Sequence, residues 1–309
     1  MNKNNKSNVV GSIITILILI VMAIVGANND GLYSSQAQNV EQVDNLENVT
    51  IHTGDGVISK IPNDGNLRVY TLDVGQGDSI LVVHNNKTML IDASTNQMGA
   101  KVVQYLKDLG ITKIDYLIGT HPHEDHIGGL DNVIKNFEIG KFYMPKKQAN
   151  TKTFEDVLDA ASNKKLKINA PSIGDKFNVG DAECEVMSIK NEADNLNDCS
   201  IVIQMSYDGV KYLFTGDMES GIESSRTWNE VDILKVGHHG SKTSSSKEFI
   251  NEINPRYSII SVGKNNRYGH PNKETLDNLS DSKIYRTDID GSIMFKIKNN
   301  KLKIETCSP

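Results

Sequence analysis

The chain has 309 residues, of which 38% are hydrophobic, 23% charged and 6% aromatic, and its formal net charge is −6. This length and apolar content suffice for one large domain or two small ones, and they exclude a wholly disordered or collagen-like protein. The acidic balance excludes a general basic coat for nucleic acid, so any contact with phosphate must come from a local site.

An uncharged apolar run occupies residues 9–27, after Lys3 and Lys6. As a helix it would be about 28 Å long, close to the hydrocarbon thickness of a bilayer. It predicts a signal peptide or signal anchor over 1–27, and the small residues at 25–27 would suit cleavage. Because the lysines hold the N-terminal side in the cytoplasm, we expect the rest at the outer face of the cell membrane, or secreted.

Residues 28–66 carry six acidic residues and one basic residue, many Asn, Gln and Ser, and little periodicity. This composition predicts a flexible acidic linker. The remaining residues, 67–309, hold 33 acidic and 30 basic groups, a net charge of −3. We expect them to form the globular domain.

Short β-branched runs open this domain, with Asn85-Asn86 as a turn between two of them. Helical spacing from Val102 to Leu109 predicts a helix that Gly110 stops, and a further helix is expected from Leu130. The other predicted helix spans 272–279, and Asp208-Gly209 is a predicted turn. Strands are predicted over 68–74, 79–84, 88–91, 114–119, 183–189, 200–207, 210–214, 232–236, 257–262, 292–297 and 302–305. Two β-rich halves with interspersed helices favour a layered α/β arrangement, αββα, over a doubly wound parallel sheet.

Three cysteines, Cys184, Cys199 and Cys307, lie far apart and form no CxxC pair. They are too few for a disulfide scaffold, and the odd count leaves at least one unpaired within the chain. We expect Cys184 and Cys199 to be small buried residues on strands.

Residues 121–126 read His-Pro-His-Glu-Asp-His, directly after the predicted strand 114–119. Three imidazoles and two carboxylates in six residues would repel or desolvate one another unless a cation organised them. Pro122 disfavours a continuous helix, so the side chains should fan out from a loop. Imidazole combined with carboxylate suits Zn²⁺, Mn²⁺ or Fe better than Ca²⁺.

This motif is the signature of the metallo-β-lactamase fold hydrolases, which the chain resembles over residues 67–309. The closer resemblance is to the hydrolase domain of the ComEC/Rec2 competence proteins and their free-standing relatives. The matching motifs are LDVGQGDS at 72–79, THPHEDHIGG at 120–129, FTGD at 214–217, LKVGHHGSKTSSS at 234–246, SVG at 261–263 and YGHP at 268–271. The resemblance implies a four-layer αββα metallo-β-lactamase fold.

The resemblance also implies one or two divalent metal ions, Zn or Mn. The implied ligands are His121 and His123 for one ion, Asp125 and His126 for the other, and Asp217 as a bridge between them. The last ligand would be His238 or His239. We favour His239, because related proteins place the ligand directly before the glycine, and His238 would then contact a ligand or the substrate.

One position departs from the family pattern, since no histidine lies between His126 and His238. Typical members have a metal-binding histidine there. Here residues 195–200 read NLNDCS, which resembles an Asn/Ser variant of the competence branch. The first ion is therefore expected to lack one protein ligand, or to take Asn197, Asp198 or water. One tight and one labile ion is as consistent with this pattern as two tight ions.

Four residues near these motifs are candidates for substrate binding. Lys242 is a lone cation among hydroxyls, with Ser241 beside it, and suits a phosphate oxygen. Asp78 either faces the site or caps a turn, and His270 either contacts substrate or packs against its neighbours. The glycines on either side of Gln76 suit a tight turn better than an anion cradle.

The resemblance implies hydrolysis by metal-activated hydroxide, with Asp125 and Asp217 as catalytic residues. We expect a phosphodiesterase or nuclease that acts on a phosphodiester such as DNA. Residues 9–27 would hold it at the outer face of the membrane. The near-neutral domain favours a grip on a few nucleotides. The alternatives are a surface phosphoesterase acting on choline-phosphate, teichoic acid or lipid headgroups, and a non-catalytic metal-stabilised binding protein. No protein partner is inferred.

Overall fold

The computed structural model describes residues 60–307. The predicted membrane segment 1–27, and the predicted linker as far as residue 59, lie outside the described residues. Within the described part, no helix has the length and apolarity needed to cross a membrane. Residues 60–66 contact the domain: the N–H of Ile61 donates to the carbonyl of Leu109 at 3.1 Å, and Arg68 pairs with Asp64 at 2.6 Å.

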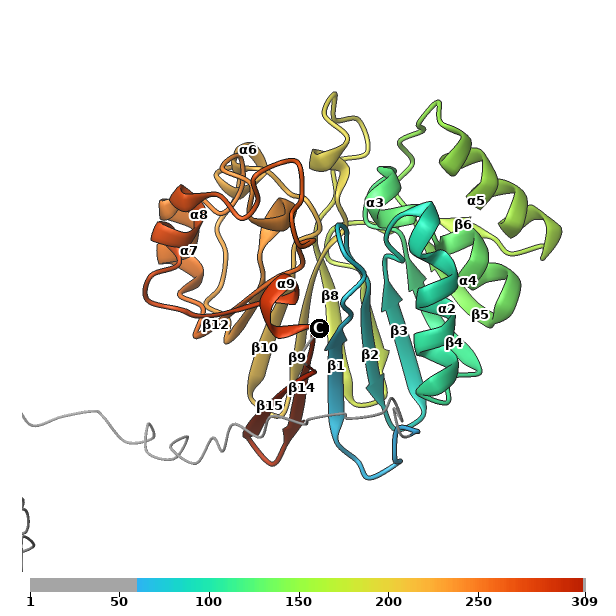
Figure 1. Cartoon of the computed structure of the whole chain (residues 1–309), viewed down its shortest axis with the longest axis horizontal. Coiled ribbons are helices and arrows are strands. Elements are labelled where there is room, and N and C mark those ends of the chain that lie inside the picture. Colours follow the sequence, from blue (N-terminus) through green and yellow to red (C-terminus); the bar gives the residue numbers. More distant parts are fainter. Residues whose placement is uncertain (1–59, 308–309) are drawn as a thin grey trace, which may run out of the picture. The chain divides into compact units, whose positions relative to one another are not determined.

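Two β-sheets lie face to face in the described region (Figure 1). The strands of the first sheet are β1 (Leu67–Thr71), β2 (Ile80–His84), β3 (Lys87–Ile91), β4 (Lys113–Ile118), β5 (Glu138–Tyr143), β6 (Ile168–Asn169), β14 (Ser292–Lys298) and β15 (Lys301–Cys307). Their order is β15-β14-β1-β2-β3-β4-β5-β6. The strands of the second are β7 (Lys176–Val179), β8 (Ala182–Ser188), β9 (Val202–Tyr207), β10 (Val210–Phe214), β11 (Ile233–Lys235), β12 (Tyr257–Ile260) and β13 (Lys283–Arg286). Their order is β13-β12-β11-β10-β9-β8-β7.

Helices flank the two sheets on opposite sides of the molecule (Figure 1). Beside the first sheet are α2 (Gly99–Asp108), α3 (Glu124–Ile127), α4 (Leu130–Asn136) and α5 (Lys152–Asn163). Beside the second are α6 (Ser220–Glu223), α7 (Lys247–Ile253), α8 (Lys273–Asn278) and α9 (Thr287–Asp290).

The burial pattern of β2 explains the layers. Ile80 and Val82 belong to the core between the two sheets, whereas Leu81 and Val83 belong to the core shared with α2, α4 and α5. Because successive side chains on a strand point to opposite faces, a strand that is apolar at every position is buried on both sides. A third core joins the second sheet to α7 and its neighbours. The predicted αββα arrangement is confirmed.

Most predicted strands are present, with ends that differ by up to three residues. Asn85-Asn86 and Asp208-Gly209 form the expected turns, with positive φ at all four residues. The sequence pattern does not predict β5, β6, β7, β13, α5, α6, α7 or α9. It predicts a loop through the histidine motif, whereas Glu124–Ile127 form the short helix α3, which begins after Pro122. Cys184 is buried on β8 as expected, but Cys199 lies in a 3₁₀ turn (Asn197–Cys199), because the predicted strand at 200–207 begins only at Val202.

Parallel pairing brings several strand ends together. β3, β4 and β5 run parallel in the first sheet, and β10, β11 and β12 run parallel in the second. Ligands of α/β proteins bind beyond the carboxyl ends of such strands. Asp92, His121, Asp217 and His238 follow β3, β4, β10 and β11 respectively, each within three residues of its strand.

Candidate metal centre

The histidine motif leaves β4 as an extended segment and enters the short helix α3. His123 is extended and caps that helix, so Asp125 and His126 lie in its only turn. A neighbouring loop packs on this turn, since the N–H of Asp78 donates to the carbonyl of Asp125 at 3.1 Å. Gly77 has φ 115° and lies so close that a Cβ would collide with that carbonyl oxygen. The expected tight turn around Gln76 is confirmed, and close approach makes glycine necessary there.

Asp217 and the two adjacent histidines follow neighbouring strands of the second sheet. The N–H of Asp217 donates to Oγ of Ser200 at 3.1 Å. His238 and His239 lie in the 3₁₀ turn Gly237–Gly240, with left-handed φ values of 47° and 53°. Two such non-glycine residues in succession cost about 1–3 kcal/mol each, a strain typical of functional sites.

One tight group of donor atoms joins the motifs of both sheets. Nε2 of His239 lies 3.2 Å from Oδ2 of Asp125 and 3.3 Å from Nε2 of His126. Nε2 of His126 lies 3.2 Å from Oδ1 of Asp217. Two ligands of one tetrahedral ion, each about 2.1 Å from it, would be about 3.4 Å apart. The separations therefore fit a divalent ion held by Asp125, His126 and His239, and a second group of His121, His126 and Asp217 lies beside it.

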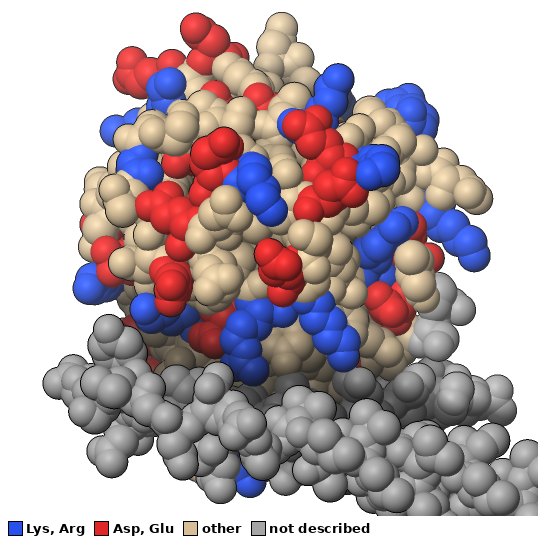
Figure 2. All heavy atoms as spheres, turned by 90° about the vertical axis from the view of Figure 1, so that its left-hand side faces the viewer, with Lys and Arg blue, Asp and Glu red and all other residues tan. Residues whose placement is uncertain are grey.

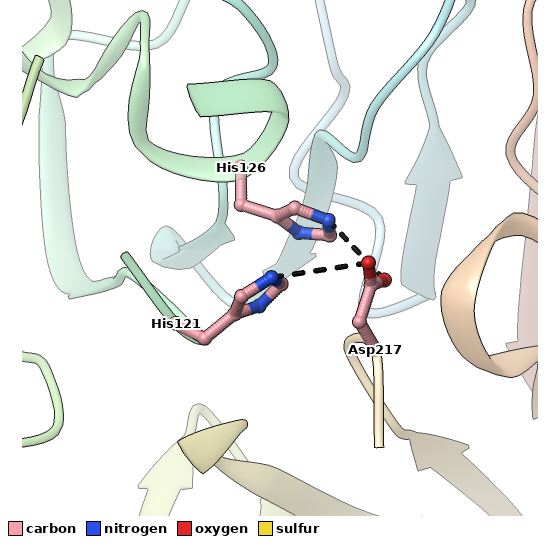
Figure 3. Close-up of side chains that lie close together, drawn as sticks. All are labelled: His121, His126 and Asp217. Carbon is pink, nitrogen blue, oxygen red and sulfur yellow. Dashed lines mark ion pairs between the residues drawn. The ribbon is translucent and has the colours of Figure 1, made fainter. Parts of the chain in front are cut away.

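His121 approaches Asp217 beside His126 (Figure 3). Its Nε2 lies 3.8 Å from Oδ2 of Asp217 and 3.1 Å from Nδ1 of His123. Nε2 of His238 also lies 3.8 Å from the same Oδ2. Four of the predicted ligands thus gather around Asp217, namely His121, His126, His238 and His239. His123 joins this group through His121, and Asp125 joins it through His239.

The two polar candidates for the missing ligand differ in their surroundings. Nδ2 of Asn197 donates to Glu219 at 3.0 Å and lies 3.4 Å from Nδ1 of His238. Oδ1 of Asn197 and Oδ1 of Asp198 are both buried without a hydrogen-bond partner in the described structure. Asn197 is therefore connected to the cluster through His238.

Two buried carboxylates lie behind the histidines. Oδ2 of Asp92 lies 2.7 Å from Nδ1 of His126, and Oδ1 of Asp78 lies 3.4 Å from Nδ1 of His239. A partner on the outer nitrogen fixes an imidazole so that its Nε2 faces the cluster. The ammonium of Lys235, fully buried, pairs with Asp78 at 2.8 Å. Nδ1 of His239 donates to the carbonyl of Ser261 at 3.0 Å, so Ser261 fixes this ring while Asp78 adds a negative charge 3.4 Å away. The burial of Asp78 removes it from contact with substrate.

The charges of the cluster shift the proton affinities of its members. Burial opposes a charge on His126, yet Asp217 and Asp92 raise its pKa well above the ordinary value. Against the same burial cost, Asp217, Asp125 and Asp78 raise the pKa of His239 to about 10. The pKa of Asp217 stays well below its ordinary value despite burial, because His126 and His239 lie beside it.

These shifts predict that metal uptake releases protons. The pKa of His239 is raised to about 10, so this ring keeps its proton at pH 7, and its Nε2 must lose a proton to bind a metal. Metal affinity should therefore rise with pH from neutral toward about 10 and fall toward acid. Calorimetric titration with Mn²⁺ in buffers of different ionisation enthalpy should show protons released on binding at pH 7. A binding heat that is independent of the buffer would contradict this prediction.

A cleft of about 590 Å³ reaches the cluster. Its lining residues are Gln76, Thr95, His123, Glu124, Asp125, Asp217, His238, His239, Asn266, Arg267, Tyr268 and His270. Of the four predicted substrate contacts, His270 lines the cleft, whereas Asp78 and Ser241 are buried elsewhere and Lys242 is exposed outside it. Arg267 is the one arginine or lysine among the residues that line the cleft. The sequence motifs alone do not indicate it.

The sequence matches a family model described as "Metallo-beta-lactamase superfamily" over residues 72–264. ComE operon protein 3 of Bacillus subtilis is 34% identical over 254 residues, and competence protein ComA of Neisseria gonorrhoeae is 29% identical over 250. These alignments cover 74% and 75% of this chain, and the chain spans about a third of each relative.

More distant proteins share the family features. The exodeoxyribonuclease YycJ of Bacillus anthracis is 22% identical over 178 residues, which are 53% of this chain and 63% of that protein. The crystal structure of the metallo-beta-lactamase fold protein YhfI from Bacillus subtilis superposes with a TM-score of 0.52 at 11% identity, covering 75% of this chain and all of that one. The structural likeness concerns the fold alone.

Proposed function

Since the chain belongs to the metallo-beta-lactamase superfamily, we propose that it is a metal-dependent phosphodiesterase or nuclease. The observation that carries the proposal is the access of the cleft to the donor cluster. A structural zinc site is closed and saturated by four protein ligands, whereas a catalytic site keeps an open position. The side chain of Asp125 is 29% exposed and lines the cleft, which favours catalysis over a non-catalytic binding protein.

The donor set suits one or two divalent ions such as Zn or Mn, because it combines imidazole nitrogens with carboxylate oxygens. Oδ1 of Asp217 is buried without a hydrogen bond in the described structure, as expected of an atom that serves a cation. Such an ion supplies an acidified water near neutral pH and positive charge for a leaving oxygen.

The side chains around the cleft supply the remaining chemistry. The pKa of Asp125 is held well below its ordinary value, despite burial, by His239 and His126. It is therefore a carboxylate at neutral pH, suited to bind a cation and to accept a hydrogen bond from the attacking water. Burial, followed by the neighbouring His238, lowers the pKa of His270 to about 4. This neutral ring lines the cleft without adding a charge to it.

Three observations support a phosphodiester substrate. Arg267 places a permanent cation at the cleft. One relative is named as an exodeoxyribonuclease and another as a competence protein. The face that carries α7 and α8 mixes acidic and basic side chains without a broad basic field (Figure 2), which suits a grip on few nucleotides. In this proposal residues 9–27 hold the domain at the outer face of a membrane, where DNA is the substrate.

Substrate screening of the purified full chain tests the proposal. The substrates are a single-stranded oligonucleotide, bis(p-nitrophenyl) phosphate, p-nitrophenyl phosphorylcholine and nitrocefin, each with Mn²⁺, with Zn²⁺ and with a chelator. We expect metal-dependent cleavage of the oligonucleotide and of bis(p-nitrophenyl) phosphate, and none of nitrocefin. Efficient turnover of nitrocefin, or metal uptake with no phosphodiester cleaved, would refute the proposal.

A further inference from the structure

We propose that Tyr268 and Arg267 form a nucleotide-binding rim at the mouth of the cleft. Tyr268 stacks on a nucleobase, and Arg267 contacts a backbone phosphate adjacent to the bond that is cleaved. This inference rests on the proposed function, because it names single-stranded nucleic acid as the substrate of that site.

Tyr268 and Asp217 lie at opposite depths of one cleft. Both line it, yet Tyr268 is 53% exposed whereas Asp217 is 1% exposed. The exposed ring therefore marks the mouth and the carboxylate marks the bottom. An exposed tyrosine in a polar loop leaves apolar area in water. Because the ring lies at the mouth of the cleft, a bound ligand can cover this apolar area.

The loop that carries Tyr268 is held in one conformation. Oδ1 of Asn266 accepts the N–H groups of Tyr268 and His270 at 3.1 and 3.0 Å. Nδ2 of Asn266 donates to the carbonyls of His270 at 2.6 Å and Gly263 at 3.1 Å. Four hydrogen bonds to one side chain fix the backbone on both sides of the ring. A ring held in place loses little freedom when a ligand binds, so stacking contributes more to affinity.

The ring of Tyr268 keeps room for a base. It packs against His270 with centroids 5.7 Å apart and planes 23° apart. The guanidinium carbon of Arg267 lies 5.1 Å from the centroid of the tyrosine ring, and Nη2 donates to the hydroxyl oxygen at 3.0 Å. These two distances place the guanidinium near the hydroxyl end of the ring rather than flat on its centre. Base-aromatic stacking needs an accessible ring face and tolerates any base.

The charge of Arg267 selects between two kinds of phosphodiester. A choline headgroup would bring a trimethylammonium to the exposed ring, and the neighbouring guanidinium would repel that cation. A nucleotide brings a neutral base to the ring and an anionic phosphate to the guanidinium. The pair therefore favours nucleic acid over choline-phosphate.

Binding of an uncleavable oligonucleotide separates recognition from chemistry. Fluorescence anisotropy of the full chain with Mn²⁺ and a phosphorothioate single strand should show affinity weakened about 5- to 100-fold by Tyr268→Ala. Tyr268→Phe should retain most of the affinity. Wild type should bind the same strand with abasic terminal residues more weakly, and Tyr268→Ala should lose that discrimination. Arg267→Ala should lower the slope of log affinity against log salt by about one.

Lys264→Ala is the matched control, because it removes an exposed cation from the same loop without touching the cleft. It should leave binding within about twofold and the salt slope nearly unchanged. Bound metal in Tyr268→Ala reports on the metal centre and should stay near wild type, and Lys264→Ala should keep wild-type turnover of bis(p-nitrophenyl) phosphate.

Several results would overturn the rim while leaving the proposed function intact. One is wild-type oligonucleotide binding by Tyr268→Ala. Another is equal loss on normal and abasic strands. A third is a greater loss of activity by Tyr268→Ala on p-nitrophenyl phosphorylcholine than on DNA. That result would mean that the ring binds a choline headgroup. Failure of the wild type to cleave any phosphodiester would instead refute the proposed function.

Discussion

Replacement of Asp217 by Asn should lower hydrolysis of bis(p-nitrophenyl) phosphate by about 10³-fold or more and reduce the metal content of the protein. Oδ1 of this residue lies 3.2 Å from Nε2 of His126, and Oδ2 lies 3.6 Å from Nε2 of His239 and 3.8 Å from those of His121 and His238. The substitution removes a buried negative charge at the centre of the imidazoles with almost no change in volume. Turnover and metal analysis of the same preparation give the measurement.

Asp194→Asn is a suitable control, since that carboxylate is exposed and outside the cleft. It should keep wild-type activity and metal content. His126→Ala should lose activity and metal as Asp217→Asn does, because Nε2 of His126 lies 3.3 Å from Nε2 of His239 and 3.2 Å from Oδ1 of Asp217. An Asp217→Asn protein with more than a tenth of wild-type turnover would contradict the assignment of Asp217 as the central ligand.

Replacement of Lys235 by Met should destabilise the protein by about 3–5 kcal/mol, because the carboxylate of Asp78 would stay buried without its cation. The ammonium of Lys235 is fully buried, pairs with Asp78 at 2.8 Å and donates to the carbonyl of Val236 at 2.9 Å. Urea unfolding at pH 7 gives the measurement. The double variant Asp78→Asn/Lys235→Met should lose less unfolding free energy than the sum of the losses in the two single variants.

Lys273→Met supplies the matched comparison, since it breaks the exposed pair between Lys273 and Asp277 and should cost no more than about 0.5 kcal/mol. The Asp78–Lys235 pair also has a pH signature. Burial alone would raise the pKa of Asp78, but Lys235 and His239 lower it to about 2. Its stabilising effect is therefore complete above about pH 4 and lost as the pH falls toward 2. A Lys235→Met protein within 1 kcal/mol of wild type would show that the pair contributes little.

The site was predictable where neighbours in sequence are also neighbours in space. His121, His123, Asp125 and His126 lie within six residues, at the end of β4 and in the single turn of α3, so their spacing alone indicates a cation. The family pattern added Asp217 and His239 from the second sheet. Lys242 follows the histidines directly in sequence, yet it lies outside the cleft. The left-handed turn at 238–239 redirects the chain, so proximity in sequence does not carry Lys242 to the cluster.

The residues that hold the histidines in place are harder to predict from the sequence than the histidines themselves. Asp92 follows β3 with no motif around it, and only the pairing of β3 with β4 brings it to His126. Lys235 did carry a signal, because a charged residue inside the apolar run of β11 must have a buried partner. Short elements such as β7 and β13 depend on tertiary pairing rather than on local propensity, which is why periodicity alone does not reveal them.

The strand order of the first sheet also determines when this sheet can be completed during translation. β1 lies between β2 and β14, and β14 is translated after every proposed metal ligand. Until β14 emerges, one edge of β1 lacks its hydrogen-bonding partner, and Phe295 is missing from the core between the sheets. Contacts so distant in sequence form late. We therefore expect the first sheet of the nascent chain to stay incomplete until β14 has been translated, although the histidines of the metal centre are already made.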